Sequence, residues 1–230
     1  MRDRDIDEAI HRAASAVPEV DPALLDRIAQ SLGGSLRPVR PLPPPWVLGG
    51  ALVVLTSAAA LTGGALLGLH GLQKMSPAVI LAIFPVLGVL CSLGATVCAR
   101  EMIPGSRRRI APWLLLTLAS LAMTTVFALL FRGYALDRFV AEGVPCLTTG
   151  LLLAVPVAAG CWLVLRRGMA VHPSAAGLAV GALAGLAGLA TLELHCPNFK
   201  AVHVMVWHTA VPLLSGVVGA FVVWAWKRAA

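Results

Sequence analysis

Six long apolar stretches dominate the chain from about residue 46 onward. Each is about as long as the roughly 20 helical residues that cross a bilayer core. They are continuously apolar and do not alternate with a period of two, which favours helices over the strands of a membrane barrel. The pattern predicts an all-α, polytopic bundle of about six transmembrane helices. The expected spans are residues 46–70, 77–98, 111–131, 146–166, 174–194 and 203–226.

Residues 1–45 have a different, amphipathic pattern. We expect one short helix within residues 5–17 and a second that begins at Asp21 and Pro22, because Asp is a favoured N-cap and Pro fits the first turn. Gly33-Gly34 predicts the end of the second helix. Both helices are near or below the length of about 12–15 residues at which isolated helices become stable, so their apolar faces need a partner. These faces are formed by Ile6, Ile10, Leu24, Leu25, Ile28 and Leu32.

Five prolines within residues 35–45 favour an extended spacer between these helices and the first span. The chain therefore divides into an N-terminal segment, residues 1–45, and a transmembrane domain, residues 46–230. The segment holds 6 Lys+Arg and 7 Asp+Glu. Helices that lie on a membrane surface usually carry a basic face, so this balance favours a protein partner over anionic lipid.

The composition agrees with a membrane location. Hydrophobic residues make up 58% of the chain and charged residues 13%, against about 45–50% and about 25% in soluble domains. The net charge of +7 does not indicate nucleic-acid binding, because the basic residues adjoin the apolar runs, where they determine topology and contact lipid headgroups. We expect the lipid bilayer, and no nucleic acid, as a direct partner.

The loops differ in positive charge, which predicts the orientation of the chain. Loops on one side, with the C-terminal end, hold eight Lys or Arg, and the other side holds four. The positive-inside rule places both termini in the cytoplasm. The connection between the fifth and sixth spans and the start of the fourth span then lie at the outer face.

Glycines in the fifth span have the spacing of a close helix–helix contact. Gly177, Gly181 and Gly185 lie four residues apart on one helix face. Small residues let helix backbones approach where lipid provides no hydrophobic drive. We favour packing within the chain over homodimerisation, and the sequence leaves the oligomeric state open.

The candidate chemistry lies at the predicted outer face. Cys196 is in the turn between the fifth and sixth spans, and Cys146 follows Pro145 at the start of the fourth span. Two cysteines at the same membrane level indicate a disulfide or a soft or transition-metal site, and the sequence does not decide between them. An oxidising outer compartment would permit the disulfide.

Three histidines are possible accessory ligands: His195, His203 and His208. His203 and Trp207 are four residues apart, so an aromatic–imidazole pair without any ligand is an alternative. On an α-helix His203 and His208 would point about 140° apart, which makes joint ligation of one ion awkward. His208 lies deeper, where an ionisable group is costly and indicates function.

At this point the residues resemble the NrsF family of membrane anti-sigma factors. The resemblance is carried by Leu194-His195-Cys196-Pro197 followed by His203, Trp207, His208, Pro212, Gly216 and Gly219. Cys146 resembles the family's other cysteine, and Leu24 to Ala29, leading to residues 36–40, resembles its cytoplasmic leader. Residues 1–20 extend beyond that leader.

The resemblance implies a bacterial inner-membrane protein that is not an enzyme. It implies an anti-sigma factor that holds an extracytoplasmic-function sigma factor through the N-terminal segment and releases it when Cys146 and Cys196 sense metal or oxidative stress. Two alternatives stay open: a membrane redox or metal-handling subunit, and a scaffold subunit of a larger membrane complex. No cofactor is certain beyond a possible metal at the two cysteines.

Overall fold

The computed structural model describes residues 7–8, 11–12, 21–35, 42–106, 110–166, 168 and 170–229. The chain divides into two compact units, Met1–Pro41 and Leu42–Ala230. The predicted helix within residues 5–17, with Ile6 and Ile10, lies largely outside the described residues. Residues 36–41 of the predicted spacer also lie outside them.

In the first unit, helix α2 spans Pro22–Ser35. The Asp21 carboxylate accepts a hydrogen bond from the Ala23 amide at 2.9 Å, so the predicted N-terminus is correct. The predicted end is wrong, because Gly33 and Gly34 keep negative φ angles and the helix continues through them to Ser35. The apolar side chains that α2 leaves exposed by 43–55% are Leu24, Leu25, Ile28 and Leu32.

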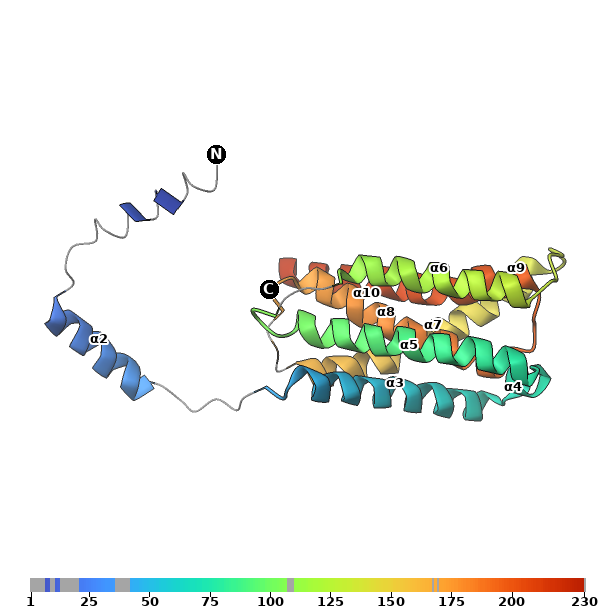
Figure 1. Ribbon diagram of the computed structural model, residues 1–230, viewed down its shortest axis with the longest axis horizontal. Helices are drawn as coiled ribbons and strands as arrows, with labels where there is room; N and C mark the ends of the chain where they lie inside the picture. The colour runs from blue at the N-terminus through green and yellow to red at the C-terminus, as the bar shows by residue number, and fades with distance from the viewer. Residues whose placement is uncertain are drawn as a thin grey trace. The chain divides into compact units, whose positions relative to one another are not determined.

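The second unit is a helical bundle with six helical spans long and apolar enough to cross a membrane, which confirms the predicted fold class (Figure 1). It is compatible with a multi-pass membrane protein. A short helix, α4 (His70–Lys74), joins the first two spans. The spans are α3 (Pro45–Leu67), α5 (Pro77–Glu101), α6 (Pro112–Leu130), α7 (Phe139–Leu165), α8 (Pro173–His195) and a composite sixth span of α9 (Ala201–His203), the π-helical η1 (Val204–His208) and α10 (Thr209–Ala229).

Proline marks the start of four spans. Pro45, Pro77, Pro112 and Pro173 are the first residues of α3, α5, α6 and α8. The first position of a helix needs no N–H donor and prefers the fixed φ of proline. The sequence therefore encodes these starts locally, and the predicted boundaries lie within one residue of them.

The start of the fourth span differs from the prediction. Helix α7 begins at Phe139, seven residues before the predicted start at Cys146. Arg138 turns the chain with a left-handed φ of 54°, and Pro145 lies inside the helix. Prolines are tolerated within membrane helices because neighbouring groups satisfy the freed carbonyls. Cys146 consequently lies about two turns into α7 instead of at its end.

Helix α8 runs through the middle of the bundle, and most of its side chains are buried (Figure 1). Its glycines pack directly on the backbone of α10: Gly177 on Gly219, Gly181 on Ser215 and Gly185 on Pro212. A Cβ atom at any of these glycines would overlap backbone atoms of α10. The small-residue face thus packs within the chain, as the sequence favoured.

We expect Gly181→Ala to destabilise the bundle. Overpacking typically costs about 1–3 kcal/mol, and here the obstacle is a carbonyl of α10 that cannot rotate away. The thermal midpoint of the purified protein in detergent measures the effect. The matched control is Gly88→Ala in α5, where a Cβ meets nothing within 4 Å and helix propensity favours Ala by about 1 kcal/mol. Equal midpoints for the two variants would contradict the packing argument.

Candidate metal and thiol site

The predicted cysteines and histidines of the site lie at one end of the bundle. We define this distal end as the end that carries α4 and the connections 131–138 and 196–200. The opposite end carries Pro45 and the C-terminus (Figure 1). Cys196 follows the last residue of α8, where its amide donates to the Leu192 carbonyl at 2.7 Å. It is therefore held by the helix end itself.

Cys146 reaches Cys196 because one face of α7 lies close to the sixth span. Gly143, Cys146 and Gly150 share that face at the spacing i, i+3, i+7. The Trp207 ring packs on Gly143, and Val211 packs on Gly150. The two glycines on either side of Cys146 therefore bring its side chain to the junction with α8 and the sixth span.

The two cysteines are free thiols in contact. Their Sγ atoms are 3.4 Å apart, compared with about 2.05 Å in a disulfide. Cys196 is buried and Cys146 is half-buried. The contact with Cys146, together with burial, raises the pKa of the Cys196 thiol, although the neighbouring His203 and His208 rings act in the opposite direction. The pair can form a disulfide or share one metal ion.

A π turn brings the two deeper histidines together. In η1 the hydrogen bonds run from i to i+5, so residues five apart lie on one face. The rings of His203 and His208 are consequently 5.3 Å apart, and the prediction that they diverge by 140° is wrong. The alternative of a His203–Trp207 pair is replaced as well, since Trp207 packs against Phe139 with ring centroids 5.1 Å apart.

His208 is oriented by an acid that the sequence analysis did not assign to the site. Its Nδ1–H donates to Glu193 Oε1 at 2.6 Å, and both side chains are almost completely buried. The opposite ring nitrogen, Nε2, is buried and has no hydrogen-bond partner. The signal was present in the sequence, because Glu193 is an acid inside an otherwise apolar span.

Four ligand atoms converge at this point. One atom each from Cys146, Cys196, His203 and His208 lies within 4.8 Å of the other three. His203 Nε2 is 3.7 Å from Cys196 Sγ. Two thiolates and two imidazoles are the ligand set of tetrahedral structural zinc sites. The donor types and their convergence therefore fit a metal ion of the zinc class.

The structure leaves His195 out of this group. Its Nδ1 is 3.0 Å from the Gly68 carbonyl, and its ring is 5.8 Å from that of His70. His195 lies on the side of the α8 terminus that faces α3 and α4, and it links the end of α8 to those elements. A role as an accessory ligand stays a prediction without geometric support.

The connection between α8 and the sixth span is fixed by its neighbours. Asn198 donates to the Glu142 carboxylate at 2.8 Å, and Lys200 Nζ lies 3.7 Å from the same oxygen. The Phe199 ring stacks on Phe131 at 5.3 Å. These contacts attach the connection after α8 to the end of α6 and the first turn of α7. They therefore fix the position of Cys196.

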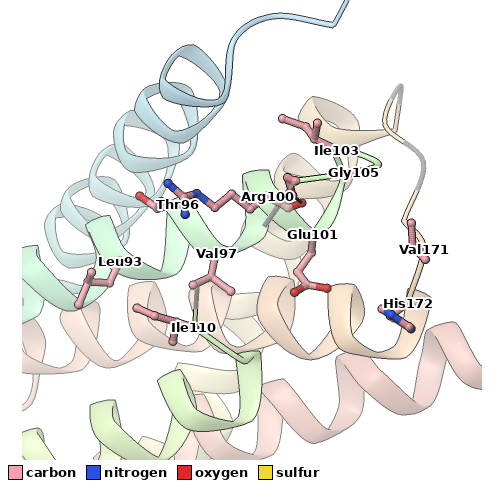
Figure 2. Close-up of a pocket in the computed structure, with 11 residues that line it drawn as sticks. Leu93, Thr96, Val97, Arg100, Glu101, Ile103, Gly105, Ile110, Val171 and His172 are labelled. Atoms are coloured by element: carbon pink, nitrogen blue, oxygen red, sulfur yellow. Dashed lines mark hydrogen bonds between the residues drawn. The ribbon is translucent and has the colours of Figure 1, made fainter. Parts of the chain in front are cut away.

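Other cysteines lie away from the site. Cys98 and Cys161 are buried in the apolar core near the opposite end, and Cys91 is partly buried against it. A separate hollow of about 470 Å³ also lies toward that end, lined by side chains that include Arg100, Glu101 and His172 (Figure 2). No cysteine is among the described residues that line this hollow.

Comparison with known proteins gives one family. The family model of NrsF, described as "Negative regulator of sigma F", matches residues 32–228, which include all six spans and every residue of the distal site. No curated protein and no solved structure matches this chain.

We expect a mild thiol oxidant such as diamide to join Cys146 and Cys196 within one molecule. The sulfurs are already in contact, and joining them needs only a small rotation of either side chain. Alkylation followed by intact mass measurement should show two fewer reactive thiols, and peptide mapping should identify the pair. Cys146→Ser is the control and should form no disulfide. A bond mapped to a different pair would contradict the geometry.

Proposed function

Because this chain belongs to the NrsF family and is a negative regulator of a sigma factor, we propose that it is a membrane-bound anti-sigma factor that holds an extracytoplasmic-function sigma factor through its N-terminal segment. The protein acts by binding and release, without catalysis. It resides in the bacterial inner membrane with both termini in the cytoplasm, as the excess of Lys and Arg on that side supports.

The exposed apolar stripe of α2 supports the proposed binding of the sigma factor. Leu24, Leu25, Ile28 and Leu32 share one face, and each is at least 43% exposed. The opposite face carries Asp26 and Gln30. An amphipathic helix of this kind typically lays its apolar face into a hydrophobic groove of a partner, with anchors at i, i+4 and i+8. The stripe gives the sigma factor a binding surface, and Ile6 and Ile10 extend the same role toward the N-terminus.

The sensing part is assigned to the distal site. A stimulus shifts the equilibrium between bound and released sigma factor only if it binds or reacts differently with the two states. Oxidation or metal binding at Cys146 and Cys196 changes the contact between α7 and the α8 terminus. Helices α7, α8 and α10 run from this site to the opposite end, so a shift at the sulfurs is transmitted along rigid elements to the side that holds the partner.

One observation favours a second candidate function. The four convergent ligand atoms would also suit a membrane metal-handling subunit. The two functions differ in their partner, because a metal-handling subunit needs no sigma factor. Binding of a sigma factor to the purified protein therefore decides between them.

We expect Leu25→Asp to weaken sigma-factor binding at least about tenfold, which corresponds to about 1.4 kcal/mol. Burial of a leucine side chain contributes about 1.5–3 kcal/mol, and a carboxylate in an apolar groove adds a desolvation cost. Titration of the full-length protein in detergent with a labelled sigma factor measures the affinity.

The matched control for that variant is Gln30→Asp, which adds the same charge to the opposite face of α2. This control should bind the sigma factor as the wild type does. Absence of any sigma-factor binding by the wild type would remove the proposal, and equal weakening by the two variants would exclude the apolar stripe as the contact.

We expect Cys146→Ser and Cys196→Ser to abolish the response to thiol oxidants and metal salts in cells. Both substitutions remove the sulfur chemistry while nearly preserving side-chain volume. A reporter gene transcribed by the sigma factor measures release before and after the stimulus. Cys161→Ser, in the core near the opposite end, is the control and should respond normally. An unchanged response in both site variants would exclude the cysteine pair as the sensor.

A further inference from the structure

We propose that Cys146, Cys196, His203 and His208 form a four-ligand site for one divalent ion of the zinc class, with Glu193 as the residue that positions His208. The inference deepens the sensing role proposed above by naming the ligands and the ion class. It rests on three independent features of the distal end: the donor set, the unpartnered Nε2 of His208 and the buried carboxylate.

The donor set is complete and compact. The four ligand atoms lie within 4.8 Å of one another, and no further residue is needed to reach tetrahedral coordination. A zinc ion binds sulfur at about 2.3 Å and imidazole nitrogen at about 2.0–2.1 Å. Any two ligand atoms of a tetrahedral site are therefore about 3.3–4 Å apart. The Sγ–Sγ separation of 3.4 Å and the Sγ–Nε2 separation of 3.7 Å already lie in this range.

An unpartnered nitrogen atom points to a missing partner in the same place. His208 Nε2 is buried and lacks a hydrogen-bond partner. The His208 side chain is 1% exposed, so bulk water does not reach this nitrogen. An unsatisfied buried polar atom costs about 1–3 kcal/mol. Bonding of the His208 nitrogen to an ion removes this cost.

Glu193 provides the second shell that a metal-bound histidine requires. Histidine ligands usually donate their other N–H to a carboxylate, which fixes the ring orientation and increases the basicity of the ligating nitrogen. Glu193 accepts the Nδ1–H of His208 at 2.6 Å, so Nε2 is left with its lone pair for the ion. A carboxylate without such a task is expensive at this depth.

Charge selects a divalent ion. On binding, the two thiols lose their protons to water, each sulfur forms a bond to the ion, and both imidazoles bind as neutral rings. Two thiolates and one divalent cation sum to zero, which leaves the Glu193 carboxylate, held by the Nδ1–H of His208, as the net charge of the buried group. Cys146 is the half-buried ligand and gives the ion its path of entry. The filled site joins α7, the end of α8 and the π turn through one centre.

Cobalt(II) titration of the reduced, metal-free, full-length protein in detergent tests this proposal. Cobalt(II) is the probe because tetrahedral thiolate coordination gives visible d–d bands and a near-ultraviolet sulfur-to-cobalt band. We expect saturation at one equivalent and displacement by zinc(II). Cys146→Ser and Cys196→Ser should each lose about half of the sulfur-to-cobalt intensity, and His203→Ala and His208→Ala should change the d–d bands.

Glu193→Gln tests whether Glu193 positions His208 for the ion or has only a structural role. The amide oxygen can still accept the Nδ1–H of His208 but carries no charge. We therefore expect the same spectrum with an affinity about 10–100-fold lower. His195→Ala, one residue from Cys196 and outside the group, is the matched control and should bind as the wild type does.

Absence of a sulfur-to-cobalt band in the folded wild type would overturn the site. An unchanged spectrum in both His203→Ala and His208→Ala would overturn the assignment of the histidines. If oxidation to the disulfide occurs while the reduced form binds no cobalt, the sulfurs act by thiol chemistry alone and the metal proposal fails. Sigma-factor binding is measured separately on the metal-free protein, so failure of that assay leaves this result intact.

Discussion

The direct contact between the backbones of α8 and α10 is the constraint on which the rest of the bundle depends. Apolar side chains gain little by leaving lipid, so helices of this composition associate through close packing and polar contacts. Gly177, Gly181 and Gly185 remove the side chains that would keep α8 away from Gly219, Ser215 and Pro212. With α10 fixed in this way, α8 becomes the central helix, and the remaining spans pack around it.

That contact also determines what lies at the distal end. Because α10 is held against α8, the chain must return from Cys196 to α10 within a short distance. It does so in the connection 196–200, after which the sixth span begins with α9 and the π-helical segment Val204–His208. The π-helical segment places His208 beside Glu193 of α8, and the rings of His203 and His208 meet edge to face at 5.3 Å. The site therefore results from the same packing that builds the core, and it cannot shift without disturbing that packing.

The distal site and the exposed apolar stripe of α2 lie in separate units of the molecule. The thiols, imidazoles and carboxylate gather at the distal end of the bundle, while the exposed apolar stripe belongs to α2 in the first unit. Helices α7, α8 and α10 connect the distal site to the opposite end of the bundle.

Periodicity and composition determined the general architecture of this protein from its sequence. Six apolar runs specified six helical spans, prolines specified where four of them begin, and Asp21 specified the start of α2. These features are local: a bilayer fixes the length of a span, and a cap or a first-turn proline acts within a few residues. The two cysteines were recognisable because each lies beside a proline at the end of a predicted span.

Only the tertiary structure decided which residues form the site. The α-helical periodicity of 3.6 residues separated His203 from His208, and the π turn brought them together. Pro145 indicated a helix start at Cys146, although α7 begins seven residues before Cys146 and carries this cysteine on its packed face. Glu193 had no assigned role until α8 and the sixth span placed it at 2.6 Å from His208. Sequence determines what each segment can form alone, whereas contacts between segments decide turn type, helix register and the partners of buried charges.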